Sequence, residues 1–405
     1  NRESRQFDGW QEVVRLPQVV LSQAYGSYPS TTRSLDASYL NETGWYIYGA
    51  KDGTGQFVVR SLAPRALLRL QPDEVVFGSR AAYRYIRQRS WANIKAQKGR
   101  VSSVLCTART DDSPNAIQTA SADWQEGDRA LVIHVYGGIG GQRAEPAAAT
   151  PIFFGHFSFG EARVIRDPLS EELRFDLRYY QVYTHNTDGL VAGTLHWSRY
   201  MGDRQFGWAG SRPVCDILIK HDAFTRYYDF SVGQRSALDY MVQQLEVMTA
   251  RYRIGDGTGG TYVGAANNCA QDSNQALFAC LRQIEQKMQT HQAYLGQWGQ
   301  QNPELGQGFT NLVSLKQALQ RKLQPLGGPK SSWARNEYNL GSTLEDEPIR
   351  NLITGLGSWR TLLPRLASDT VVKVFLEHGA SAWVLRTNQI GGYAPEIEPI
   401  APMTI

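Results

Sequence analysis

The period of the apolar residues changes near residue 235, and that change limits the folds that this chain can adopt. Before it, short apolar runs separated by turn residues, such as GWYIYGA, QFVVRSL and DRALVIHVYGG, are typical of β-strands. After it, RSALDYMVQQLEVMTARYR and FTNLVSLKQALQRKL repeat their apolar residues at helical spacing. Strands followed by helices predict an α+β fold with an antiparallel sheet.

The length and one flexible stretch suggest how the chain is divided. With 405 residues it is long enough for two or three domains. The small residues of GGIGGQRAEPAAATP, at 137–151, are typical of a linker or long loop. We predict a β-rich domain with a basic helical segment at residues 1–140, a second domain at 151–330, and a C-terminal extension at 331–405 that packs on the core. The extension should contain a short helix in EPIRNLITGL and a strand in ASAWVLRT.

Composition excludes several classes of protein. No run approaches the ~18 consecutive apolar residues of a membrane-spanning helix, so we expect a soluble protein without a transmembrane segment. The four cysteines form no CxxC pair, which argues against a structural zinc site. GDGTGG, at 255–260, lacks the Gly-Lys-Ser/Thr of a phosphate-binding loop. We therefore expect neither a metal nor a cofactor.

The first residue, Asn1, bears on the compartment. Removal of a signal peptide would leave such a residue and would make the protein periplasmic or extracellular. A transit peptide or a missing start explains Asn1 equally well, and the sequence does not choose among these explanations.

Positive charge is concentrated in one segment. Residues 78–100 carry seven basic residues and no acidic one. On a helix, Arg80, Arg84 and Arg87 would share one face. Such a face either is simply solvated or binds an anionic surface or polymer. No nucleic-acid-binding motif accompanies it, so we expect no nucleic-acid partner.

Cys269 stands at the predicted start of a helix, in YVGAANNCAQDSNQAL. The N–H groups and the dipole at a helix N-terminus stabilise a thiolate, and they can also bind an oxyanion. Asn267 and Asn268 would add amide donors, unless one of them caps the helix. A small core residue explains Cys269 equally well at this stage. Cys280 lies on the apolar face of the same helix and is interpreted as a core residue.

A cysteine nucleophile needs a base, and His156 is the first candidate. FFGHFSFG places it in an apolar strand, where its imidazole must find a hydrogen-bond partner. We expect this strand and LRFDLRYYQVYTHN to form a hairpin. The returning strand carries Asp176 and His185, and either of them would orient the imidazole of His156. His185 is also the second candidate for the base itself. His196 is the third candidate base. Register decides which residue reaches His156, and the sequence does not fix it.

GHFSFG, a polar residue on the neighbouring strand and NNC at a helix start together resemble the circularly permuted papain-like superfamily. That group includes permuted relatives of the NlpC/P60 amidases and the lecithin:retinol acyltransferase-like proteins, and NNCA is similar to a motif of a bacterial periplasmic domain family within it. The resemblance covers about residues 150–295. It implies that Cys269 is the nucleophile and His156 the base. The spacing between the two residues is wider than compact members of the group have.

A weaker similarity concerns the tail. YNLGSTLEDEPIRNL and ASAWVLRTNQIGG resemble segments of bacterial proteins catalogued as Abi/CAAX-type proteases, but the glutamate motif of those enzymes is missing here.

Two functional hypotheses follow. The first is a thiol-dependent hydrolase, a peptidase or amidase (a papain-like cysteine protease in the broad sense), with a peptide or amide-bearing substrate. The second is a non-catalytic scaffold or binding protein of the same fold that contacts an anionic surface or polymer through its basic segment.

Overall fold

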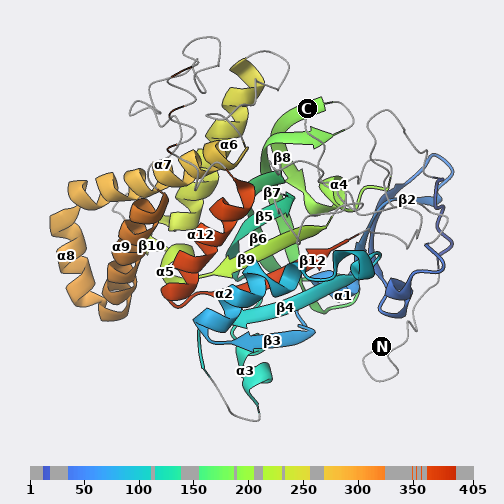
Figure 1. The fold of residues 1–405 in the computed structure, drawn as a ribbon, viewed down its shortest axis with the longest axis horizontal. Helices are drawn as coiled ribbons and strands as arrows, with labels where there is room; N and C mark the ends of the chain where they lie inside the picture. Colours follow the sequence, from blue (N-terminus) through green and yellow to red (C-terminus); the bar gives the residue numbers. More distant parts are fainter. Residues whose placement is uncertain are drawn as a thin grey trace.

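One eight-stranded sheet forms the centre of the protein (Figure 1). The strand order is β3-β4-β12-β9-β5-β6-β7-β8. β3 and β4 are parallel, and every other neighbouring pair in this sheet is antiparallel. The strands are β3 (Glu74–Phe77), β4 (Val101–Thr107), β5 (Arg129–Gly137), β6 (Gly155–Arg166), β7 (Leu173–Asn186), β8 (Gly189–His196), β9 (Val214–Lys220) and β12 (Ser381–Thr387).

The structure is a computed structural model that describes most of the chain. The described residues are 12–18, 35–110, 115–137, 155–186, 189–204, 213–229, 233–255, 269–323, 349, 353, 357 and 363–388.

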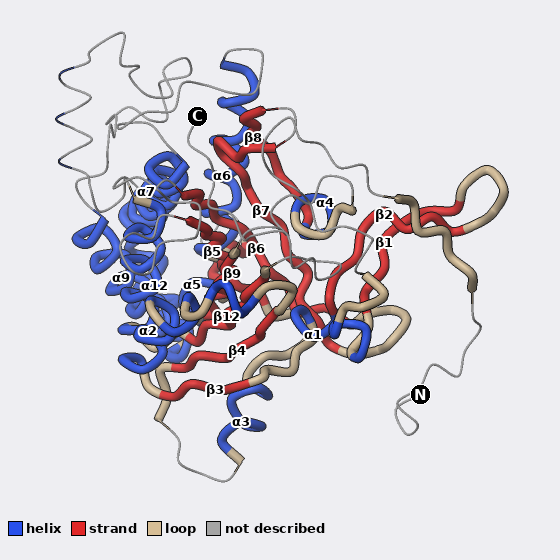
Figure 2. Tube along the Cα trace, turned by 45° about the vertical axis from the view of Figure 1, so that its right-hand side comes forward, coloured by secondary structure: helices blue, strands red, loops and turns tan. Residues whose placement is uncertain are grey.

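Helices cover one face of the sheet, and a smaller set of elements covers the other (Figure 2). The helical face carries α2 (Ser79–Arg87), α5 (Asp222–Thr225), α6 (Ala237–Gly255), α7 (Cys269–Thr290), α8 (Gln292–Gln301), α9 (Pro303–Leu323) and α12 (Pro364–Glu377). The opposite face carries α1 (Arg65–Leu68), α3 (Ala116–Ala122), α4 (Trp197–Tyr200) and the antiparallel hairpin of β1 (Trp45–Lys51) and β2 (Phe57–Pro64).

Smaller elements complete the described part of the chain. These are the two-stranded pair β10 (Tyr228–Asp229) and β11 (Gln234–Arg235), and 3₁₀ helices at Tyr39–Glu42, Arg89–Trp91 and Ile94–Gln97.

The alternation of side chains along a strand explains the two cores. In β5, Leu131, Ile133 and Val135 belong to the cluster beneath the helices, whereas Val132 and Tyr136 belong to the cluster on the opposite face. Side chains of a strand alternate between faces, and a strand buried on both faces is apolar almost throughout. β5 is therefore covered on both sides.

The predicted hairpin is confirmed. β6 and β7 pair antiparallel, from Phe159 opposite Tyr180 to Arg166 opposite Leu173. The turn DPLSEE, at 167–172, connects them, and the Asp167 carboxylate accepts hydrogen bonds from the backbone of Leu169 and Ser170. This is the local bonding by which aspartate favours turns.

The α+β class is confirmed, but the sheet joins the three segments that the sequence suggested as separate units. β3, β4 and β5 come from residues 1–140, β6 to β9 from 151–330, and β12 from 331–405. The strand in ASAWVLRT is confirmed as β12, which lies between β4 and β9 in the sheet. The helix predicted in EPIRNLITGL lies mostly outside the described residues.

Two helices lie where the sequence placed them. α7 begins at Cys269, and α9 ends at Leu323, the last residue of its predicted segment. Among the described helices, none has both the length and the apolar character needed to span a bilayer.

Candidate functional site

The imidazole of His156 on β6 is bound by Gln181 of β7. Nε2 of His156 and Oε1 of Gln181 are 2.5 Å apart, and both side chains are buried. An amide oxygen only accepts hydrogen bonds, so we assign the hydrogen to Nε2, which makes Nδ1 the basic nitrogen. The expected hydrogen-bond partner therefore exists, but it is Gln181, a residue that the sequence did not single out.

The ring of His156 lies on the face of the sheet that α4 covers. Its centroid is 5.3 Å from that of Tyr136 and 6.0 Å from that of His134, both on β5. Tyr136 belongs to the cluster on this face, whereas Phe157, the next residue of β6, belongs to the cluster beneath the helices. His156 thus points away from the face on which the body of α7 packs.

Cys269, the first residue of α7, lies against the edge of β6 beside His156. Its Sγ is 4.0 Å from the carbonyl oxygen of Gly155, and the backbone N–H of Phe157 also interacts with the sulfur. These two groups belong to the residues on either side of His156. The first residue of α7 therefore contacts the backbone of β6 on both sides of the predicted base, whose imidazole lies on the other face of the sheet.

The thiol of Cys269 is buried, with an exposed fraction of 7%. Burial raises its pKa from 9.0 to about 12, although the backbone group of Phe157, and those of Ala270 and Cys269 itself, favour the thiolate and lower it. Desolvation disfavours a charged sulfur more than these donors stabilise it. At neutral pH the resting group is therefore a neutral thiol.

A second polar cluster, which sequence reasoning missed, lies next to His156. Nδ1 of His134 is 2.6 Å from Oδ1 of Asp216 on β9, and the Tyr179 hydroxyl donates to Oδ2 at 2.8 Å. Nε2 of His134 lies 3.2 Å from the Tyr200 hydroxyl of α4. All four residues are buried, so these bonds compensate for the desolvation of the carboxylate.

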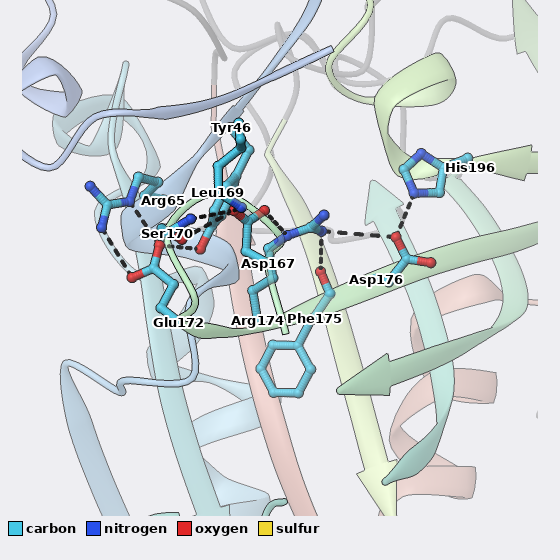
Figure 3. Close-up of polar contacts among 10 residues, drawn as sticks. All are labelled: Tyr46, Arg65, Asp167, Leu169, Ser170, Glu172, Arg174, Phe175, Asp176 and His196. Carbon is cyan, nitrogen blue, oxygen red and sulfur yellow. Dashed lines mark hydrogen bonds and ion pairs between the residues drawn. The ribbon is translucent and has the colours of Figure 1, made fainter. Parts of the chain in front are cut away.

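Asp176 does not reach His156. Its Oδ1 is 2.8 Å from Nε2 of His196, and the close-up in Figure 3 shows this pair beside Arg174. In the sheet, Asp176 lies opposite Arg163, which is about 23 Å from His156 along the strand. Burial raises the pKa of Asp176, but the bond to His196 and nearby positive charge outweigh it, so the pKa lies below its usual value.

His196 caps α4. Its Nδ1 accepts hydrogen bonds from the backbone N–H of Ser198 at 3.1 Å and from the Ser198 hydroxyl at 2.7 Å. Asp176, His196 and Ser198 thus form an acid–imidazole–hydroxyl series. Ser198 is buried, and it lies within a four-residue helix that His196 itself caps. We therefore assign the series to anchoring α4 on β7.

Two further ion pairs, drawn in Figure 3, lie where the β1–β2 hairpin and α1 contact the main sheet. Arg65 of α1 donates two hydrogen bonds to Glu172, at 2.8 and 3.0 Å, and the Tyr46 hydroxyl of β1 donates a third at 2.7 Å. Arg174 donates to Asp167 at 2.9 Å. These bonds hold the β6–β7 turn against the first strand of the chain's small hairpin.

Three predicted site residues lie wholly or partly outside the described residues. Asn267 and Asn268 precede the first described residue of α7. For His185 the structure describes the backbone, which pairs with Leu190 of β8. The proposed roles of these residues stay predictions.

The predicted arginine face exists on α2. Arg80, Arg84 and Arg87 are exposed, while Ala82 and Ile86 are buried beneath them. Arg87 lies 3.7 Å from Asp369 of α12. Neither Arg80 nor Arg84 forms an ion pair with a described residue.

Within the described part of the chain, no three His, Cys, Asp or Glu side chains are arranged to hold a metal ion. Comparison with protein-family models, curated proteins and solved structures finds no match to this chain. The resemblance to the permuted papain-like superfamily therefore rests on the sequence motifs, and a functional conclusion rests on the contacts described above.

Proposed function

We propose that the protein is a thiol-dependent hydrolase of amide or peptide bonds. Cys269 is the nucleophile, His156 the general base, and Gln181 orients the imidazole. The observation that carries the proposal is the position of the Cys269 sulfur against the backbone groups of Gly155 and Phe157, on either side of His156. A nucleophile, a base and a group that fixes the base are the parts of such a site.

The route from thiol to imidazole passes Gly155. The ring of His156 is on the face of α4, and the sulfur is at the edge of β6. Gly155 has no side chain, so the sulfur can approach the strand backbone there. Under the proposal, the proton passes from Sγ of Cys269 to Nδ1 of His156 by way of the space that the missing side chain of Gly155 leaves.

The chemistry begins from a neutral pair. Nδ1 of His156 takes the thiol proton as Sγ of Cys269 bonds to the acyl carbon, and the carbonyl electrons move to oxygen. The backbone N–H groups of Cys269 and Ala270 stabilise that oxyanion. The imidazolium then protonates the leaving nitrogen as the C–N bond breaks. Water, deprotonated by His156, hydrolyses the thioester and releases the acid and the thiol.

Gln181 is a positioning residue in this scheme. Its Oε1 accepts the hydrogen of Nε2 and so keeps the lone pair on Nδ1. Gln181→Leu should therefore slow labelling by an amide-directed probe about ten- to a hundredfold and shift the midpoint of the pH profile. A merely structural role would not move that midpoint.

The test is labelling of the full chain with a panel of electrophilic peptide and amide probes, followed by mass spectrometry. We expect the label on Cys269, its loss in Cys269→Ala, and a rate at least about a hundredfold lower in His156→Ala. Cys280→Ala is the matched control, because Cys280 lies in the core on the same helix and should not affect labelling. Unchanged labelling in His156→Ala contradicts the proposal.

A second function is favoured by α2. We propose that its arginine face contacts an anionic surface, because Arg80 and Arg84 are exposed without an ion-pair partner among the described residues. Co-sedimentation with anionic vesicles should decrease with salt, and Arg80→Gln/Arg84→Gln should abolish it. Zwitterionic vesicles should not bind. Equal binding to both kinds of vesicle would exclude this surface.

A further inference from the structure

Asp369 of α12 lies against Arg87, one of the three residues of the arginine face on α2. The two helices pack side by side (Figure 1), and Oδ2 of Asp369 is 3.7 Å from Nε of Arg87. This distance is too long for a hydrogen bond, and no described residue donates one to the carboxylate. Asp369 therefore acts on Arg87 through its charge.

The carboxylate of Asp369 is nearly buried, although its partner is exposed. The exposed fraction of the side chain is 11% for Asp369 and 52% for Arg87. A second positive charge that acts on Asp369, that of Arg365, is also buried, and its guanidinium stacks on the ring of Trp91 at 3.7 Å. A carboxylate that is removed from water without hydrogen bonds is costly to keep ionised.

This cost affects the ionisation of Asp369. Burial raises its pKa above the ordinary value of 3.8, and the charges of Arg365 and Arg87, which lower the pKa, do not compensate. Asp369 is therefore ionised at neutral pH and takes up a proton at a higher pH than an exposed aspartate does. Its protonation adds one unit of positive charge to the surface formed by α2 and α12.

Several charged and titratable groups surround Asp369. They are Arg365, Lys373 and Glu377 of α12, Tyr83 and Arg87 of α2, Cys215 of β9 and Arg386 of β12. Burial raises the pKa of Tyr83 and, to about 11, that of Cys215, so both are neutral at and below neutral pH. Glu377 forms an ion pair with Lys373 of its own helix, 3.7 Å away. Among the described groups, Asp369 is therefore the acid that pairs with Arg87.

We propose that Asp369 controls the affinity of the arginine face for an anionic surface: its carboxylate offsets one positive charge, and its protonation in acid strengthens binding. The inference rests on the anionic-surface function proposed for α2 and adds how that surface is regulated. Asp369 partly neutralises Arg87 at neutral pH, whereas neither Arg80 nor Arg84 forms an ion pair with a described residue. The full positive charge of the face is thus available only when Asp369 is neutral.

The test is co-sedimentation of the full chain with vesicles of phosphatidylglycerol and phosphatidylcholine at neutral pH. Asp369→Asn keeps the shape of the side chain and is uncharged at every pH, so it has the charge of the acid state permanently. We expect it to bind about fivefold more tightly than the unmodified protein, which is the effect of one charge near an anionic membrane. Glu304→Gln is the matched control, because it removes an equal charge from the exposed start of α9 and should change binding far less.

The same comparison in acid measures the pH dependence. Binding of the unmodified protein should strengthen as the pH falls from about 7.5 to about 5, and the difference from Asp369→Asn should narrow. Equal binding of Asp369→Asn and the unmodified protein at neutral pH, or an equally large gain in Glu304→Gln, overturns this inference alone. Failure of both the unmodified protein and Asp369→Asn to bind anionic vesicles overturns the proposed surface and its regulation together.

A second measurement decides if Asp369→Asn does not fold. The ¹³C resonance of the Asp369 carboxyl group in the unmodified protein is followed against pH, with and without small bicelles that contain phosphatidylglycerol. Because coupling between two sites is reciprocal, the bicelles should raise the midpoint of this titration by about 0.7 pH units. The midpoint of Glu304 should move less. An unchanged midpoint of Asp369 overturns the inference.

Discussion

The ionisation of Cys269 gives the sharpest prediction. Its pKa of about 12, against an ordinary value of 9.0, lowers the thiolate fraction at neutral pH about a thousandfold, since that fraction falls tenfold for each pH unit below the pKa. We therefore expect iodoacetamide to alkylate Cys269 at least about a thousand times more slowly than a free thiol of ordinary pKa.

The assay is the second-order rate of alkylation as a function of pH, measured by mass spectrometry of the peptide that contains Cys269. The logarithm of the rate should rise with unit slope from about pH 6 to about pH 10, without a plateau. Restricted access to the buried sulfur lowers the whole curve and leaves its slope unchanged. Glutathione provides the reference rate, and Cys269→Ala should remove the signal.

A plateau with a midpoint near neutrality would refute this reasoning. It would mean that a thiolate–imidazolium pair is already formed with His156 in the resting protein and that burial does not control the sulfur. The comparison with His156→Ala separates the two cases, because the substitution removes a plateau that depends on the imidazole and leaves the unit slope of a curve set by burial unchanged.

Three further predictions concern stability. Tyr179→Phe removes a hydrogen bond to the buried Asp216 and should cost about 2 kcal/mol in urea unfolding; a loss below about 0.5 kcal/mol would show that the bond is not needed. Burial raises the pKa of Glu172, but the hydrogen bonds that it accepts from Arg65 and from a tyrosine lower the pKa below its value in the unfolded chain. The ionised Glu172 therefore stabilises the fold fully at neutral pH, and this contribution is lost as the pH falls through the pKa of the folded state. Arg65→Met should therefore lower the free energy of unfolding at neutral pH, and the variant should lose less further stability in acid than the unmodified protein does. Unfolding curves of both proteins at neutral and at acidic pH check this. In Gly160→Ala the added Cβ would clash with a backbone carbonyl of β7, so we expect little folded protein by circular dichroism, and a normal melting curve would contradict the packing.

The elements that the sequence predicts well are those with local signals. The β6–β7 hairpin follows from alternating apolar runs around a turn that begins at Asp167, and α7 from the helical stripe that starts at Cys269. β12 was predicted as a strand, but its position between β4 and β9 depends on pairing with residues more than 150 positions away. Local propensity carries no information on such partners.

The site was predicted only in part, for the same reason. His156 stands out in an apolar strand, but its partner depends on register, which the sequence left open among residues of the returning strand. The register places Gln181, and not Asp176, near His156. His134 lies in a similar apolar run and would have been found by the same argument, together with Asp216, the single acid of its strand.

The central place of β12 has a consequence for the folding of this chain during synthesis. Until residues 381–387 leave the ribosome, β4 and β9 have no partner along the edges that β12 fills, and each presents unpaired backbone groups. Sheet closure then requires contact between segments nearly three hundred residues apart, which is slow because a long loop must close first. We expect chains that stop before residue 381 to aggregate through these open edges, and a chaperone that delays collapse to raise the yield of the complete chain.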